Sequence, residues 1–291
     1  MSILSIQSWV TYGHVGNAAA LFPLQRLGAE VWAINTVQFS NHPGYGGFTG
    51  RIFEGAATAA LVDGLEARGV LGQVDAVLSG YLGEPATGEA VLDAVARVRA
   101  VRPDALYCCD PVMGDRAGGI YVRPEVASLL QQRAPELADI LTPNQFELEL
   151  LMPGLRAGSA PTLQQIGEAA RALRGRMRPD GPALVLVTSV EARETPPGSI
   201  DLLLACGSGS VLLRTPRLDL EVNGAGDLIA ALFLLHVLRM TDPVAALEQA
   251  ASSVWGVLNR TAEAGLREPM IVQAQDELVT PTRRFLVMPS T

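Results

Sequence analysis

Three small residues, Gly224, Ala225 and Gly226, precede Asp227 and a strongly apolar run, 228–235. The apolar run predicts a helix, and the three backbone N–H groups at its positive end would form an anion site. Asp227 would place a negative side chain beside the bound anion. Such a carboxylate has a purpose if it accepts a proton from the group that reacts with the anion. The pattern therefore indicates phosphoryl transfer to a hydroxyl group. A plain helix cap with glycines for tight packing is the alternative reading of the same residues.

The composition is that of a globular enzyme. Of 291 residues, 48% are hydrophobic and 18% are charged, and the net charge is -8 without a long block of either sign. This argues against a nucleic-acid or anionic-membrane partner. The longest apolar helical segment, 228–238, is too short to span a membrane, and no secretory signal opens the chain. We therefore expect a cytoplasmic protein.

All 22 basic residues are arginines, because the sequence contains no lysine. A Walker-type P-loop and Schiff-base chemistry both require lysine and are excluded. Phosphate charge must then be met by backbone groups, arginine or metal. The sequence has three cysteines, Cys108, Cys109 and Cys206. They lack zinc-site spacing and the even count of a disulfide framework, so we expect them to be buried and to pack as small apolar side chains.

Short apolar runs alternate with longer helical patterns, which predicts an α/β fold with a mostly parallel sheet. Strands are expected at 3–7, 31–36, 76–78, 105–109, 140–141 and 183–187. Helices are expected at 17–27, 55–68, 88–100, 124–133, 144–152, 163–177, 224–238 and 243–264, the first interrupted by Pro23. Residues 200–214 indicate an antiparallel hairpin around 207–209. The pattern of the tail from Glu268 is ambiguous, with a helix to Leu278 followed by an extended segment as one interpretation.

Two irregular segments are candidates for function. Residues 38–50 show neither helical nor strand periodicity and indicate a loop or small flap. Residues 113–121 contain three glycines and look mobile, which makes them a candidate lid. Asp110 directly follows a buried strand, where open α/β sheets place their chemistry. Nothing marks a boundary or a repeat, so residues 1–291 are expected to form one domain.

An ordered set of motifs resembles the pyridoxal kinases of the ribokinase superfamily over nearly the whole chain. The most particular is the run Val37-Gln38-Phe39-Ser40-Asn41-His42. The others are 6–8, 13–17, 22–25, 35–36, 79–81, 110–115, 142–147 and 224–227. The resemblance implies a ribokinase-like three-layer sandwich. It also implies transfer of the ATP γ-phosphate to the hydroxymethyl oxygen of pyridoxal, pyridoxine or pyridoxamine.

On the nucleotide side, the resemblance assigns roles residue by residue. Asp227 is the base, and Gly224, Ala225 and Gly226 form the anion hole. Asp110 and Glu147 match the acidic pair around magnesium. A capping or salt-bridge role would also explain Asp110, and the preference for acids in the first turn of a helix would also explain Glu147. Further matches are Thr142 and Thr188 near a monovalent cation and the phosphates, Asn144 and Ser189 at the phosphates, and Asp115 and Tyr121 in the lid.

On the substrate side, Ser8 matches a hydrogen-bonding residue at the pyridine ring. Val15, Phe39 and Tyr81 match a flat apolar slot, although Val15 and Phe39 could equally be core residues. His42, like His14, is expected to be structural or to orient the substrate.

The chain departs from the family pattern beside this pocket. Pro43 stands where a threonine that contacts the substrate is usual, and Trp9 stands where histidine is common. Thr188 replaces the lysine of many bacterial members. ATP-dependent phosphorylation is therefore better supported than the identity of the acceptor. The alternatives are a hydroxymethylpyrimidine kinase-like enzyme and a non-catalytic vitamer-binding protein; a homodimer is expected from the family.

Overall fold

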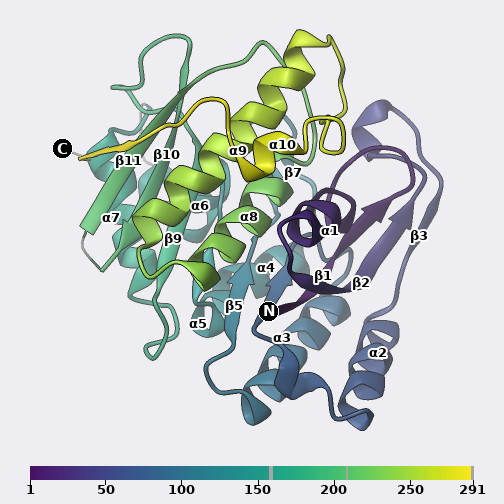
Figure 1. The fold of residues 1–291 in the computed structure, drawn as a ribbon. Helices are drawn as coiled ribbons and strands as arrows, with labels where there is room; N and C mark the ends of the chain where they lie inside the picture. Colours follow the sequence, from purple (N-terminus) through teal and green to yellow (C-terminus); the bar gives the residue numbers. More distant parts are fainter. Residues whose placement is uncertain (157–159, 208, 290–291) are drawn as a thin grey trace.

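The computed structural model describes residues 1–156, 160–207 and 209–289 (Figure 1). Within these ranges the centre is a ten-stranded sheet in the order β12-β11-β10-β9-β8-β5-β4-β1-β2-β3. Its strands are β1 (Ser2–Val10), β2 (Glu30–Phe39), β3 (Gly50–Ile52), β4 (Ala76–Ser79), β5 (Leu106–Cys109), β8 (Ile140–Leu141), β9 (Leu184–Val190), β10 (Ser199–Cys206), β11 (Gly209–Pro216) and β12 (Val287–Pro289). The six central strands, β2, β1, β4, β5, β8 and β9, pair in parallel with their neighbours. The outer strands, β3 at one edge and β10, β11 and β12 at the other, pair antiparallel.

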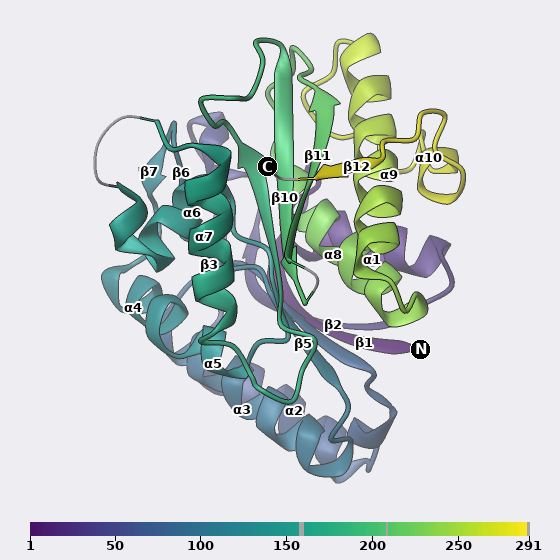
Figure 2. The same ribbon diagram turned by 90° about the vertical axis from the view of Figure 1, so that its left-hand side faces the viewer.

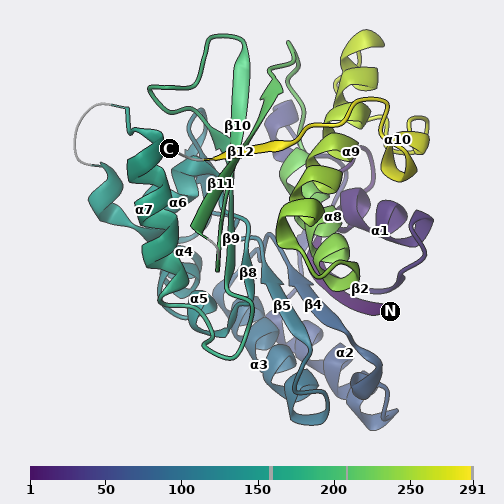
Figure 3. The ribbon, with the colours of Figure 1, turned by 60° about the vertical axis from the view of Figure 1, so that its left-hand side comes forward.

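Helices cover both faces of the sheet (Figures 2 and 3). One layer holds α2 (Gly55–Ala67), α3 (Pro85–Val101), α4 (Pro124–Gln132), α5 (Ala134–Leu137), α6 (Gln145–Leu151) and α7 (Leu163–Arg174). The other holds α1 (Asn17–Arg26), α8 (Ala225–Arg239), α9 (Pro243–Glu263) and α10 (Asp276–Val279). Single turns of 3₁₀-helix lie at Pro43–Tyr45, Leu71–Gln73 and Pro153–Arg156. The α/β fold with a mostly parallel sheet between helical layers is confirmed.

The sheet separates two hydrophobic cores because successive side chains of a strand point to opposite faces. On β5, Tyr107 and Cys109 belong to the core under the first helical layer, whereas Cys108 belongs to the other. These cysteines and Cys206 are free and buried, as the sequence predicts.

Helix α8 is apolar on all sides and lies inside the second layer of helices. It packs against both α1 and α9, and every residue from Leu228 to His236 is buried. A helix surrounded in this way needs no polar face. Its burial fixes the position of its N-terminus, where the Gly224–Asp227 segment lies.

Several element boundaries differ from the expectations. Strand β2 runs to Phe39, and β9 continues to Val190, so Thr188 and Ser189 lie within the strand. Pro23 lies inside α1. The helix expected in the tail is wrong apart from α10. Before it, the Ile271 N–H donates to the Pro269 carbonyl and the Ala274 N–H to the Met270 carbonyl, both at 2.8 Å, so isolated turns take the place of a continuous helix.

The antiparallel hairpin is present as β10 and β11, and residue 208 of its expected turn lies outside the described residues. Among the helices that the structure describes, none combines the length and hydropathy needed to cross a bilayer.

Candidate active site

The turn before α8 is held against the loop that follows β1. Gly224 is the N-cap of α8 with a φ of 87°. A Cβ at this position would lie 1.7 Å from the carbonyl oxygen of His14, so only glycine fits. The close approach brings the first turn of α8, with Ala225, Gly226 and Asp227, to the loop between β1 and α1.

Gly16 makes the second close approach in this region. Its φ is 55°, and an added Cβ would lie 2.4 Å from the Ser8 Oγ. The backbone N–H groups of Gly16 and of Asp227 bond to the Asp227 carboxylate and lower its pKa, but burial has the larger effect, and the net shift is upward. A raised pKa makes the carboxylate a stronger proton acceptor. Ser8 and Asp227 therefore both lie beside Gly16.

Asp110 lies at the end of β5 and is buried. Burial raises the pKa of its carboxyl well above the usual range, and repulsion from Glu147 and Asp227 adds to this effect. The Thr142 hydroxyl donates a hydrogen bond to Asp110 Oδ1 at 2.9 Å and opposes the shift. Three carboxylates from distant parts of the chain therefore lie close enough to repel one another.

Glu147 has a structural role that the sequence left open. It forms a capping box with Asn144, whose N–H donates to Glu147 Oε2 at 2.9 Å, and Glu147 Oε1 accepts the Met113 N–H at 2.8 Å. The Asn144 amide donates to the Gly114 carbonyl at 2.9 Å. Burial raises the pKa of Glu147 to about 8 despite these bonds. The first turn of α6 therefore anchors the base of the proposed lid.

This acidic cluster fits a magnesium ion. Burial and mutual repulsion disfavour the charged forms of these carboxylates, and a nearby cation would favour those forms. The described residues contain no group of three or more His, Cys, Asp or Glu side chains that could hold a metal alone. Magnesium needs only one or two carboxylates when water and phosphate oxygens supply the remaining ligands. Asp110 and Glu147 meet that requirement.

The proposed lid is a small hairpin of β6 (Gly114–Asp115) and β7 (Gly119–Ile120). The Asp115 carboxylate accepts the Gly118 N–H at 2.5 Å and closes the turn. Tyr121 is half exposed. The pKa of its hydroxyl is raised by burial and then by four carboxylates, those of Glu147, Asp115, Asp110 and Asp227. Tyr121 therefore lies close to the acidic cluster.

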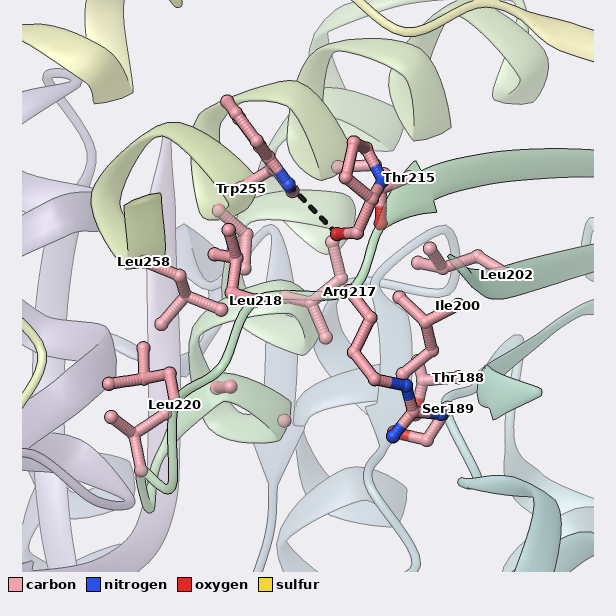
Figure 4. A pocket seen from close by; sticks show the side chains of 17 residues that line it. Thr188, Ser189, Ile200, Leu202, Thr215, Arg217, Leu218, Leu220, Trp255 and Leu258 are labelled. Carbon is pink, nitrogen blue, oxygen red and sulfur yellow. Dashed lines mark hydrogen bonds between the residues drawn. The ribbon is translucent and has the colours of Figure 1, made fainter. Parts of the chain in front are cut away.

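A largely apolar pocket begins at Thr188 and Ser189 and extends to α9 (Figure 4). Its other lining residues are Ile200, Leu202, Thr215, Pro216, Arg217, Leu218, Leu220, Val222, Ala225, Gly226, Ile229, Ala251, Val254, Trp255 and Leu258. Because Ala225 and Gly226 belong to the turn before α8, the pocket reaches the proposed anion site. An apolar pocket that ends at a helix N-terminus suits a nucleotide, with the base in the apolar part and the phosphates at the turn.

Two threonines and their neighbours join the pocket to the acidic cluster. Thr188 pairs with Asn144 in an isolated bridge, and the Thr188 N–H donates to the Pro143 carbonyl at 2.9 Å. Ser189 has a φ of 52°, which is uncommon for a residue other than glycine and often marks functional sites. Thr142 and Thr188 are thus on adjoining segments.

The residues expected around a pyridine ring also come together. Val15 and Phe39 belong to one small buried cluster, against which Tyr81 packs. The ring of Phe39 lies 4.6 Å from that of Phe48. Pro43 is exposed at the start of a short turn, and the Nδ1 atom of His42 accepts the Gly44 N–H at 3.2 Å. Val15 and Phe39 therefore serve as core residues as well as candidate slot residues.

Glu268 was not identified from the sequence, although it joins three segments beside the candidate slot residues. Its carboxylate accepts the His14 N–H at 2.9 Å and the Tyr45 hydroxyl. The guanidinium of Arg267 lies 5.3 Å from the centre of the Tyr45 ring. A single acid in an irregular tail gives no local signal. Only its long-range contacts reveal it.

Comparison with known proteins agrees with this arrangement. The phosphomethylpyrimidine kinase family model matches residues 63–270. Pyridoxal kinase PdxY of Granulibacter bethesdensis is 57% identical over 285 residues, with 98% of each chain covered. The PdxY protein of Deinococcus radiodurans is 52% identical over 286 residues, covering 98% of this chain and 95% of that protein.

Solved structures of pyridoxal kinases are also similar to this chain. The pyridoxal kinase of Leishmania donovani in complex with ADP and pyridoxine has a TM-score of 0.89 and 31% identity, covering 99% of this chain and 98% of that one. The family expected from the motifs is confirmed. The chain belongs to the pyridoxal kinase family and has its ribokinase-like fold.

Proposed function

We propose that this chain is an ATP-dependent kinase that phosphorylates the hydroxymethyl group of pyridoxal and of the related vitamers pyridoxine and pyridoxamine. The observation that carries the proposal is the position of Asp227. It lies in the first turn of α8, next to Gly226 of the apolar pocket, and its carboxylate bonds to Gly16, which packs on Ser8. A nucleotide and a vitamer bound on these two sides would meet at this carboxylate.

The reaction follows from this position. Asp227 accepts the proton of the vitamer hydroxyl while the hydroxyl oxygen forms a bond to the γ-phosphorus and ADP leaves. The N–H groups of Gly224, Ala225 and Gly226 stabilise the negative charge on the transferred phosphoryl group. The lid residues Asp115 and Tyr121 would exclude water that could otherwise hydrolyse ATP. The shared turn thus supplies both the base and the anion hole.

The acidic cluster would hold magnesium through Asp110 and Glu147. When bound, magnesium neutralises phosphate charge and orients the phosphate oxygens. Thr142 and Thr188 would supply oxygens to a monovalent cation, and Asn144 and Ser189 would bind the phosphates. The burial of Asp110 and Glu147 close to each other supports a cation here, because a cation would offset the repulsion between their charged forms.

Ser8, Val15, Phe39, Tyr81 and His42 would surround the pyridine ring, with Pro43 at the edge. The cluster of Val15, Phe39 and Tyr81 supports this slot. A homodimer and a cytoplasmic location are proposed from the family resemblance alone.

A hydroxymethylpyrimidine kinase activity is the second candidate. The match to the phosphomethylpyrimidine kinase family model favours it, and Pro43 and Trp9, which depart from the pyridoxal kinase pattern, keep it open. The extent of identity to proteins named pyridoxal kinase favours pyridoxal.

The deciding experiment measures ADP release by the purified protein with magnesium and ATP. Pyridoxal, pyridoxine, pyridoxamine and hydroxymethylpyrimidine serve as acceptors, with an acceptor-free reaction as the control for ATP hydrolysis. We expect the highest kcat/KM with pyridoxal. A preference for the pyrimidine would overturn the proposal in favour of the second candidate. Vitamer binding without turnover would identify a non-catalytic binding protein.

A further inference from the structure

The apolar pocket has one charged residue among its described lining residues, Arg217. Figure 4 shows its side chain extending toward Thr188 and Ser189, away from the apolar end near Leu258. The guanidinium therefore lies at the polar end of the pocket, beside Thr188, which pairs with Asn144. A nucleotide bound with its base among the apolar side chains would direct its phosphates past this group.

The backbone on both sides of the Arg217 side chain is fixed. The Trp255 indole N–H donates to the Pro216 carbonyl at 3.1 Å, and the Arg217 N–H donates to the Gly198 carbonyl at 2.9 Å. The side chain therefore starts from a defined point at the end of β11. Less ordering is needed when a ligand binds to a group whose backbone is already held.

The guanidinium of Arg217 forms an exposed ion pair with Glu191. Arg217 Nη2 lies 2.6 Å from Glu191 Oε1, and the two side chains are 45% and 54% exposed. Exposed ion pairs contribute little to stability because water solvates both charges. A phosphate group can replace this carboxylate at small cost and offers more oxygens in a geometry that suits the planar guanidinium.

On the basis of the function proposed above, we propose that Arg217 binds a phosphate group of the nucleotide, exchanging Glu191 for phosphate oxygens. Because the sequence contains no lysine, an arginine must supply any side-chain cation at the phosphates. Glu191 keeps the guanidinium at the mouth of the pocket when no nucleotide is bound. Arg217 is thus a specificity residue for the charged part of the nucleotide, whereas the apolar lining recognises the base.

The test compares ADP with adenosine by titration calorimetry on the full chain, since adenosine lacks phosphates. Arg217→Ala should weaken ADP binding roughly 10- to 100-fold, as expected for a hydrogen bond to a charged group, and leave adenosine binding within about twofold. Arg217→Lys should recover part of the ADP affinity. Glu191→Gln should leave ADP affinity unchanged or higher. Arg68→Ala is the matched control, because this exposed arginine after α2 does not line the pocket.

Other results would overturn the inference. An equal loss for ADP and adenosine would show that Arg217 only shapes the pocket. An equal loss of ADP affinity in Arg217→Ala and Glu191→Gln would show that ADP binding depends on the intact ion pair between these residues, and not on a contact from Arg217 to phosphate. Unchanged ADP affinity in Arg217→Ala would exclude phosphate binding while leaving the kinase function intact. If the unsubstituted protein binds no ADP and phosphorylates none of the acceptors, both the proposed function and this inference fail.

Discussion

The carboxylate of Glu268 accepts a hydrogen bond from the hydroxyl of Tyr45, a residue 223 positions earlier in the chain. Burial and this bond raise the pKa of the Tyr45 hydroxyl to about 12, so it remains a donor at neutral pH. The same carboxylate holds the His14 N–H. One acid of the tail therefore holds the turn after His42 and the loop before Val15, two segments beside the proposed vitamer slot.

Replacing Glu268 with alanine should raise the KM for pyridoxal and leave the KM for ATP within about twofold. The loss of hydrogen bonds worth about 1–2 kcal/mol corresponds to a rise of roughly 5- to 30-fold. Steady-state kinetics with each substrate varied in turn measures the difference. Glu263→Ala, which removes an exposed acid at the end of α9, is the control. Equal changes in both KM values would contradict a role confined to the vitamer side.

Replacing Asp227 with asparagine should lower kcat by roughly 10²- to 10⁴-fold, the usual contribution of a general base. The amide has nearly the size of the carboxylate but accepts no proton at neutral pH. ATP affinity should change little, because the lost interaction forms mainly in the transition state. Single-turnover kinetics and ADP titration separate the two effects. An unchanged kcat would exclude Asp227 as the base.

Replacing Pro43 with threonine should lower the KM for pyridoxal. The substitution adds a hydroxyl and an N–H at the turn that follows His42, where the unsubstituted residue offers neither. One new hydrogen bond would lower the KM roughly three- to tenfold. A KM that is unchanged or higher would mean that other residues of the pocket compensate for the proline.

His236 should make the protein less stable in mild acid. It is buried in α8, and neither ring nitrogen has a hydrogen-bond partner within the described ranges. Burial, and then Arg239, lower its pKa from 6.5 to about 4. Between these values the unfolded chain binds the proton more readily than the folded one, so the free energy of unfolding falls as the pH falls below 6.5.

This effect amounts to about 2 kcal/mol between pH 7.5 and pH 5 for a pKa shift of this size. Urea unfolding of the unsubstituted protein and of His236→Leu at both pH values measures it. The variant should lose less stability in acid by about this amount. The same acid loss in both proteins would show that His236 is not responsible.

Much of the fold follows from local sequence patterns. Apolar runs separated by helical periodicity specify the parallel strands, and the all-apolar segment after Asp227 specifies a helix that is buried on every side. The end of β9 was missed because Thr188 and Ser189 interrupt the apolar run. Backbone pairing continues there nevertheless, with the Asn144 bridge on one side.

The structure places the carboxylates of three predicted site residues close enough to repel one another, and their catalytic and metal-binding roles stay predictions. Asp227 and Asp110 were identified from residue type and position, and Glu147 from the family resemblance. Glu268 and Arg217 were not, because their significance depends on Tyr45, Glu191 and the pocket wall, which only the folded chain brings to them. The dual role of Glu147 as a helix cap and lid anchor likewise depends on the Met113 N–H.

Both outer strands of the large sheet are only three residues long, β3 at one edge and β12 at the other. An unpaired strand is a template on which another chain can add, and short edge strands limit that risk. Without β12, the eight-residue strand β11 would become the edge. Removing residues 287–289 should therefore promote self-association into aggregates.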